Sequence, residues 1–307
     1  MDVPGIPSPL PAVLQAVARE RRLALVGGAV RDLLLHRVHN DPWRGVPDLD
    51  LVVEGRASDL VGRLERALAP GALRAAQEHG AYGTVELELV IEGQPVLLDV
   101  ASARAETYPQ PAENPLVSLG ALSDDLARRD FSINAMALDL ASGELLDPHG
   151  GQGDLQRRQL RLLHAGSLRD DPTRLVRGAR YAARLGFALE PASAEQARAT
   201  LAAWPWCWRP GDPPGLAPAA LGTRLRMELE LLLEREPWPA ALAALQRWGG
   251  LALLDGQLQD DRHWRRWWPV RPIPWPWPSG CRSPIACTGC WPSGCSCGGG
   301  CPTGLGT

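Results

Sequence analysis

Two aspartates separated by one residue, Asp48 and Asp50, begin the apolar segment DLDLVV. Side chains alternate between the two faces of a β-strand, so both carboxylates lie on one face, roughly 6.5–7 Å apart along the strand. Carboxylate oxygens are the ligands that hard divalent cations prefer, and two carboxylates so placed can share a pair of ions. The pair therefore predicts phosphoryl transfer, with a purely structural Asp-x-Asp as the alternative.

A glycine pair stands in front of these aspartates. Residues 23–26 (LALV) predict a buried strand, Gly27 and Gly28 end it, and the next residues have apolar side chains at helical spacing. Glycine lets the backbone approach a phosphate, and the N-terminus of the following helix attracts an anion. The pattern predicts a phosphate-binding turn, with a simple turn as the alternative.

A third cluster of polar side chains lies in the stretch RRDFSINAMALDL. Arginine side chains can clamp a triphosphate, while aspartate and asparagine can hold ribose hydroxyls. The alternative is a solvated helix end. The residues concerned are Arg128, Arg129, Asp130 and Asn134.

Residues 167–186 predict a helix that begins near Pro172 and ends at Gly186. Asp171 and Arg174 are three residues apart, which makes them neighbours on one face. Cytosine and adenine both present an amino donor beside a ring-nitrogen acceptor, so one carboxylate and one guanidinium could accept both bases and reject uracil and guanine. The alternative is an ordinary ion pair within the helix.

Together these stretches resemble the class II tRNA nucleotidyltransferase and bacterial poly(A) polymerase family, in the same order, over about residues 20–262. The resemblance implies addition of CMP or AMP from CTP or ATP to the 3′ end of tRNA, with two magnesium ions. It favours Asp99, in the strand VLLDV, as a third carboxylate rather than a strand-end residue. The implied roles are metal binding and catalysis for Asp48, Asp50 and Asp99; phosphate binding for Gly27, Gly28 and Arg31; ribose and triphosphate binding for Arg129, Asp130 and Asn134; and base selection for Asp171, Arg174 and Arg177.

The expected fold is α+β: a small mixed-sheet, polymerase-beta-like nucleotidyltransferase head followed by an all-helical neck and body. The head spans residues 1–150 and the helical part residues 151–262, and the turn with Gly151 and Asp154 between them has an expected structural role. Residues 104–121 contain three prolines and predict a long loop. In the family such a loop helps to switch nucleotide choice, and a plain surface loop is the alternative. The expected last neck motif carries Arg224, Arg226 and Glu228.

The segment 263–307 is rich in Trp, Pro, Gly and Cys and has no helical or strand period. Cys287-x-x-Cys290 and Cys295-x-Cys297 could suggest zinc, but they lack a second pair with ligand spacing. We interpret the segment as disordered or as an out-of-frame product of GC-rich coding sequence.

All 32 basic residues are arginine, and the net charge of −3 excludes a general basic field for nucleic acid. Neither a membrane span nor a signal peptide is apparent, so we expect a cytoplasmic protein that binds tRNA and nucleoside triphosphates but neither DNA nor membranes. Two alternatives remain open, namely a poly(A) polymerase and a non-catalytic remnant that binds RNA or nucleotides.

Overall fold

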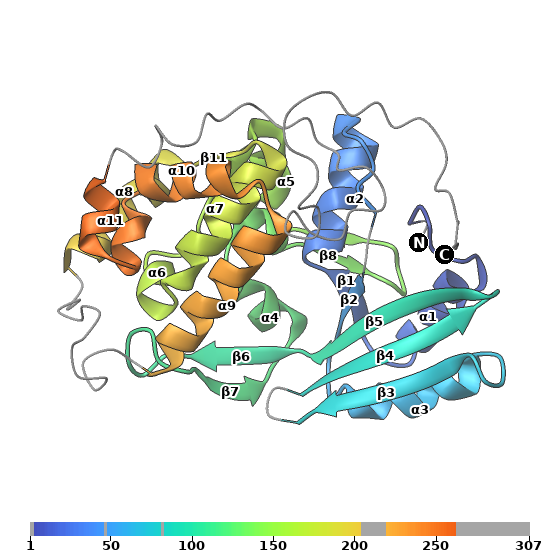
Figure 1. The fold of residues 1–307 in the computed structure, drawn as a ribbon. Helices are drawn as coiled ribbons and strands as arrows, with labels where there is room; N and C mark the ends of the chain where they lie inside the picture. Colours follow the sequence, from blue (N-terminus) through green and yellow to red (C-terminus); the bar gives the residue numbers. More distant parts are fainter. Residues whose placement is uncertain (1–2, 46–47, 81–82, 204–218, 262–307) are drawn as a thin grey trace, which may run out of the picture.

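The computed structural model describes residues 3–45, 48–80, 83–203 and 219–261 (Figure 1). A seven-stranded sheet occupies the N-terminal half and a group of helices the C-terminal half, so the predicted α+β class is confirmed. In the described ranges no helix is long and apolar enough to span a membrane. The expectation for residues 263–307 lies outside these ranges.

The large sheet is mixed, as predicted, with the strand order β3-β4-β5-β2-β1-β8-β9. Strands β2 and β5 pair in parallel, and every other neighbouring pair is antiparallel. The strands are β1 (Leu23–Val26), β2 (Asp48–Val53), β3 (Leu73–His79), β4 (Thr84–Ile91), β5 (Gln94–Ser102), β8 (Ala137–Asp139) and β9 (Leu145–Leu146).

Alternation along β2 decides which of its side chains reach the core. Leu49 and Leu51 are buried and pack with the helices α1 (Pro9–Ala18) and α3 (Ser58–Ala67). Asp48 and Asp50 are one residue out of step, so they lie on the opposite face. At its far end that face is covered by α4 (Leu122–Ala127), which contributes apolar side chains to a smaller cluster with β1 and β2.

The prediction of a long loop over residues 104–121 is wrong in part. The structure forms an antiparallel pair there, β6 (Arg104–Thr107) with β7 (Leu116–Leu119). The three prolines fall in the connection between these strands, where the missing N–H groups do not interrupt the ladder. Strand β3 was also not anticipated, because its side chains are mostly exposed and show no apolar period.

The C-terminal half is built around α7 (Thr173–Leu185), which packs against α9 and α10 (Figure 1). It ends at Gly186 in a left-handed conformation with φ of 71°, as predicted. A short parallel pair, β10 with β11, corrects the expectation of an all-helical part. The other elements of the described chain are α2 (Gly28–His39), η1 (Ser132–Asn134), α5 (Gly151–Arg157), β10 (Gln159–Leu160), α6 (Ser167–Asp170), β11 (Ala188–Leu189), α8 (Pro191–Ala203), α9 (Ala219–Arg235), α10 (Trp238–Arg247), η3 (Gly250–Leu253) and α11 (Gly256–Asp260).

The turn between the two halves is closely packed. A Cβ atom on Gly151 would clash with the carbonyl oxygen of Ser132, so only glycine allows this approach. The buried Asp154 accepts a hydrogen bond of 2.6 Å from the Ser132 hydroxyl and one of 2.8 Å from Arg161 Nε. These contacts support the expected structural role of Gly151 and Asp154.

Candidate active site

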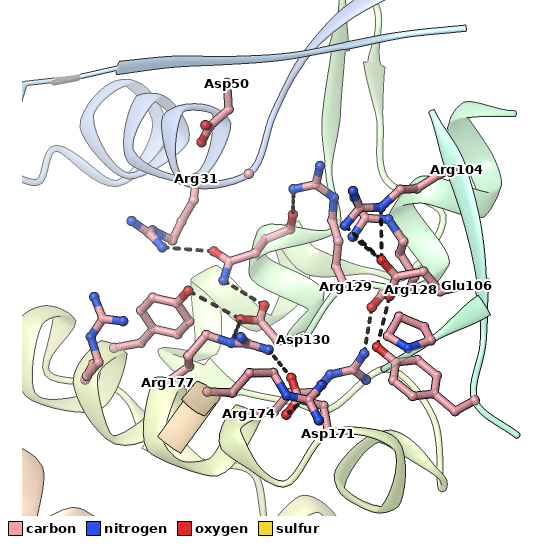
Figure 2. Close-up of a pocket in the computed structure, with 18 of the residues that line it drawn as sticks. Arg31, Asp50, Arg104, Glu106, Arg128, Arg129, Asp130, Asp171, Arg174 and Arg177 are labelled. Carbon is pink, nitrogen blue, oxygen red and sulfur yellow. Dashed lines mark hydrogen bonds and ion pairs between the residues drawn. The ribbon is translucent and has the colours of Figure 1, made fainter. Parts of the chain in front are cut away.

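A cleft of about 570 Å³ lies between the sheet and the helices, and it brings together most of the predicted site residues (Figure 2). We call it the cleft below. Its walls come from the turn after β1, the segment around η1, and the first turns of α7. The predicted residues that line it are Gly27, Gly28, Arg31, Asp50, Arg128, Arg129, Asp130, Asn134, Asp171, Arg174 and Arg177.

Asp99 lines a second cavity that shares Asp50 and Arg129 with the cleft. In the parallel register Asp99 is the direct partner of Asp50, so both carboxylates stand on the same face of the sheet. Asp48 lies on that face at the exposed start of β2 and lines neither of these two cavities. Glu86 is the partner of Asp99 on β4 and lines the second cavity. Its strand shows the alternating pattern in the sequence, but only the register puts Glu86 beside Asp99.

These carboxylates are crowded. Part of Asp50 is open to solvent, but loss of water around the rest of the carboxyl raises its pKa to about 6. The nearby charges of Asp99 and Asp48 also raise this pKa, whereas Arg129 lowers it. Burial, followed by Asp48 and Glu86, also raises the pKa of Asp99. As the side chains stand, no three acidic, His or Cys groups of the described residues converge closely enough to hold a metal ion. The sheet supplies the oxygen donors, and side-chain rotation would have to bring them together.

The glycine pair ends β1 and leads into α2, as the sequence predicts. Gly27 has φ of 69°, which favours glycine, and caps the N-terminus of α2. A Cβ atom there would lie 3.1 Å from Arg129 NH1 and 3.6 Å from Asp50 Oδ2. The bare backbone therefore lets a helix N-terminus, a guanidinium and a carboxylate meet at one edge of the cleft.

Arg31 is buried and has specific partners. Its Nε and NH2 donate to the two oxygens of Asp32, both at 2.9 Å, and its NH1 donates to Asn134 Oδ1 at 2.9 Å. Asn134 in turn donates to Asp130 Oδ1 at 3.0 Å. This chain of contacts runs from the turn expected to bind phosphate to the group expected at the ribose (Figure 2).

The structure overturns the interpretation of Arg128 and Arg129 as a solvated helix end. Both donate to Asp125, a fully buried carboxylate that no pattern in the sequence distinguishes. Burial opposes the charge of Asp125, but the two guanidinium groups outweigh it and hold its pKa below the ordinary value. Arg128 also pairs with Glu106 at 3.1 Å, while Arg129 faces both cavities.

Asp171 and Arg174 are both buried, but they do not pair with each other. Asp171 has an extended backbone before α7, and its Oδ1 accepts from the N–H and the hydroxyl of Thr173 at 3.1 and 2.6 Å. Arg174 donates to Ser167 Oγ at 3.0 Å and to the carbonyl of Arg128 at 2.8 Å. The alternative of an ion pair within the helix is therefore wrong for the described structure.

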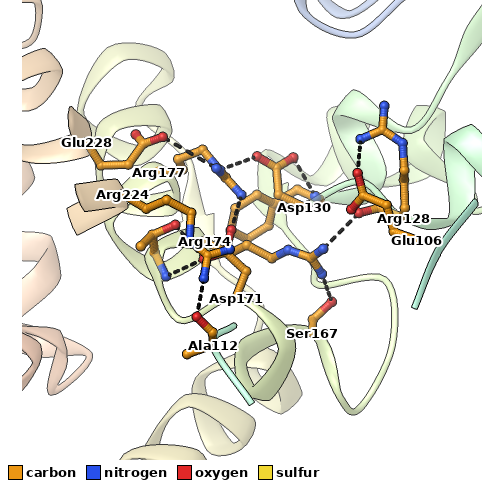
Figure 3. A network of polar contacts seen from close by, with 12 residues as sticks. Glu106, Ala112, Arg128, Asp130, Ser167, Asp171, Arg174, Arg177, Arg224 and Glu228 are labelled. Atoms are coloured by element: carbon orange, nitrogen blue, oxygen red, sulfur yellow. Dashed lines mark hydrogen bonds and ion pairs between the residues drawn. The ribbon is translucent and has the colours of Figure 1, made fainter. Parts of the chain in front are cut away.

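Arg177 links three carboxylates from three parts of the chain (Figure 3). Its nitrogens lie 3.2 Å from Asp130, 3.1 Å from Asp171 and 3.4 Å from Glu228 on α9. Burial disfavours the charge of Asp130 and Asp171, but Arg177 leads the groups that outweigh it and lower both pKa values. Arg177 therefore fixes the spacing between the group expected at the ribose and the group expected at the base.

The residues expected in the last neck motif divide into two groups. Arg224 donates to the carbonyl of Ala112 and lies 3.8 Å from Asp171, and Glu228 binds Arg177 and Arg180 (Figure 3). Arg226 points outward, is 80% exposed and pairs with Glu230. Tyr108 and Tyr181 also line the cleft and had no distinguishing signal in the sequence.

In comparison with known proteins, residues 23–161 match the family model of the poly(A) polymerase head domain. A CC-adding tRNA nucleotidyltransferase of Deinococcus radiodurans is 44% identical over 241 residues, which cover 77% of this chain and 56% of that protein. An A-adding tRNA nucleotidyltransferase of Halalkalibacterium halodurans is 41% identical over 183 residues, 58% of this chain and 39% of that protein. The chain thus spans about half the length of these curated relatives.

Solved structures are similar over the same region. A CCA-adding enzyme in its apo form II has a TM-score of 0.64 and 31% identity, and the match covers 80% of this chain and 53% of that one. A tRNA nucleotidyltransferase complexed with a primer tRNA and an incoming ATP analog has a TM-score of 0.58 and 30% identity, covering 79% and 62%.

Proposed function

Because the chain belongs to the class II tRNA nucleotidyltransferase and bacterial poly(A) polymerase family, we propose that it is a template-independent RNA nucleotidyltransferase. It transfers CMP, AMP or both from CTP and ATP to the 3′ end of tRNA and releases pyrophosphate. One observation carries this proposal: Asp50 on the sheet and the buried Asp171 and Arg174 on the helical side line the same cleft.

The donor set of the sheet face fits magnesium. Asp48, Asp50 and Asp99 offer only carboxylate oxygens, which Mg²⁺ prefers. Burial and the neighbouring carboxylates Asp99 and Asp48 raise the pKa of Asp50. Two Mg²⁺ ions bound there would lower the pKa of the attacking 3′-hydroxyl and would neutralise the charge that develops on the triphosphate.

The opposite wall of the cleft binds the nucleotide. The N-terminus of α2, Arg31 and Arg129 attract the triphosphate, and Asp130 and Asn134 bind the ribose. Asp171 accepts a hydrogen bond from the amino group of cytosine or adenine, and Arg174 donates to the adjacent ring nitrogen. Uracil and guanine present the opposite pattern, so each would leave buried polar groups unpaired. Arg177 holds Asp171 and Asp130 at a fixed spacing.

We assign the chemistry to residues 1–150 and the nucleotide selection to residues 151–262. A cytoplasmic location follows from the substrates, because the enzyme must meet tRNA and free nucleotides in one compartment.

The test is an incorporation assay with a tRNA that lacks its terminal CCA. The full chain is incubated in magnesium with each of the four labelled nucleoside triphosphates, and the tRNA is then resolved by gel electrophoresis. We expect incorporation from CTP, ATP or both, and very little from UTP or GTP. Absence of incorporation together with absence of CTP and ATP binding would contradict the proposal. The same assay distinguishes CC addition, A addition and a longer A tract by the length of the product.

A further inference from the structure

We propose that Tyr181 is a specificity-determining residue that contacts a ribose hydroxyl of the incoming nucleotide together with Asp130. This inference rests on the proposed function, in which Asp130 faces the sugar. Tyr181 lies on α7, lines the cleft, and directs its hydroxyl to Asp130 Oδ2 at 3.3 Å.

The contacts of Asp130 leave a ribose hydroxyl one place to bind. Oδ1 accepts from the N–H of Phe131 at 2.8 Å and from Asn134 Nδ2 at 3.0 Å, which fills its two acceptor positions. Oδ2 accepts a hydrogen bond from Tyr181, while Arg177 Nε lies 3.2 Å away as an ion pair without hydrogen-bond geometry, so one acceptor position of Oδ2 remains open. A hydroxyl that approaches Asp130 must therefore bind at Oδ2, next to the oxygen of Tyr181.

The Tyr181 hydroxyl is suited to that position. While it donates to Asp130, its oxygen keeps two lone pairs that can accept a hydrogen bond from the ribose. Burial, reinforced by Asp130, raises the pKa of Tyr181 to about 12, so the group remains a neutral hydroxyl. A sugar that lacks the contacted hydroxyl offers no donor to this pair, and the same position can therefore discriminate between ribose and that deoxy sugar.

The ring of Tyr181 is held by contacts that do not involve its hydroxyl. It meets Phe131 edge to face with the ring centroids 6.0 Å apart, and the guanidinium groups of Arg31 and Arg184 lie 5.5 and 6.0 Å from its centroid. Tyr181→Phe should consequently remove the hydroxyl and leave the ring in place. Tyr108→Phe is a matched control, since Tyr108 also lines the cleft and donates to a carboxylate, Glu106 Oε2, at 2.9 Å.

The experiment measures the affinity of the full chain for CTP, 2′-deoxyCTP and 3′-deoxyCTP by titration calorimetry in magnesium. We expect the wild type to prefer CTP over at least one deoxy analogue, which identifies the hydroxyl that is contacted. Tyr181→Phe should weaken CTP about fivefold, the effect of one hydrogen bond, and leave that analogue unchanged. Tyr108→Phe should keep the CTP-to-deoxyCTP ratio of the wild type.

If Tyr181→Phe keeps the wild-type ratio of CTP affinity to deoxy-analogue affinity, the inference is overturned. This holds whether both affinities stay unchanged or both fall equally, and an equal fall is what a structural role produces. If the variant does not fold, the wild type is titrated with the analogue that carries fluorine in place of the contacted hydroxyl. Fluorine cannot donate, so this analogue should bind as weakly as the deoxy form, and binding like CTP would overturn the inference. A wild type that binds neither CTP nor ATP contradicts the proposed function itself, whereas an active wild type whose Tyr181→Phe variant keeps the same ratio contradicts only the role of Tyr181.

Discussion

Asp50 on β2 and Asp99 on β5 are direct partners in the only parallel pair that the described part of the large sheet contains. Two further strands, β3 and β4, separate them in sequence. A slip of one residue in this pairing would turn Asp99 towards the core and leave Asp50 without its neighbour. The register therefore determines whether the third carboxylate belongs to the site.

Asp50→Ala and Asp99→Ala should each reduce nucleotide addition by on the order of 10³-fold. Each removes a carboxylate expected to hold magnesium, which supplies several kcal/mol of transition-state stabilisation. Neither side chain is part of the buried core, so the fold should remain intact. Single-turnover incorporation and circular dichroism measure the two properties.

Glu65→Ala is the control for these variants, since Glu65 is an exposed acid on α3, the helix that packs against the other face of the sheet. It should keep the incorporation rate of the wild type. Turnover near the wild-type value in Asp50→Ala would show that the carboxylates have no catalytic role.

Base selection should depend on Asp171 and Arg174. Replacing both by alanine should reduce the preference for CTP and ATP over UTP and GTP by about tenfold or more, because each lost hydrogen bond to a buried base edge contributes on the order of 1–3 kcal/mol. A competition assay with all four nucleotides measures this preference. Arg226→Ala, on the exposed side of α9, should keep it. Full selectivity in the double variant would mean that these residues only organise the start of α7.

Local features of the site were predictable from the sequence. The positive φ of Gly27, the stop of α7 at Gly186 and the shared face of Asp48 and Asp50 each depend on a few neighbouring residues. The partners of Arg177 were not predictable in the same way, because Asp130 and Glu228 lie 47 residues before it and 51 residues after it in sequence and meet only in the fold. Strand register and long-range ion pairs depend on packing that no local pattern specifies.

Arg224→Met should loosen the connection between β6 and β7. Arg224 donates to the carbonyls of Ala112 and Glu113, while the N–H of the buried Ala112 donates to Arg169. Without the guanidinium these carbonyls lose a donor, so the connection should open more often. Hydrogen exchange followed by mass spectrometry should show faster exchange in the peptide that contains residues 108–119. The Arg224→Met variant should also have a several-fold higher KM for CTP in the incorporation assay, because Arg224 lies 3.8 Å from Asp171.

Arg226→Met tests whether that effect is specific, since it removes an exposed guanidinium two residues away on the same helix. Its exchange pattern over residues 108–119 should match the wild type. Equal exchange in the Arg224 and wild-type proteins would rule out an anchoring role for Arg224.

Arg177→Met should destabilise the fold by about 3–5 kcal/mol at pH 7, the usual cost of removing one partner from a buried ionic group. Asp130, Asp171 and Glu228 would be left without their shared cation. Arg198→Met is the control, because Arg198 forms an exposed pair with Glu195 and should cost under about 1 kcal/mol. Urea unfolding measures both values, and a loss in Arg177→Met no larger than the control would contradict a structural role for the network.

The pH dependence of that difference provides a separate test. In the wild type Arg177 helps to hold the pKa values of Asp130 and Asp171 below their ordinary value of 3.8, despite burial. A carboxyl group with a lowered pKa stabilises the fold fully above its unfolded pKa and loses this contribution as the pH falls through the folded pKa. The two proteins share one unfolded state, so the difference in unfolding free energy between wild type and Arg177→Met depends on the folded-state pKa values alone. Without the guanidinium, burial raises the pKa values of Asp130 and Asp171 in the variant, so the difference should be largest near pH 7 and shrink as the pH falls towards the lowered wild-type pKa values. Urea unfolding at a series of pH values measures it. A difference that persists unchanged down to pH 3 would mean that Arg177 stabilises the protein through packing of its side chain and not through its charge.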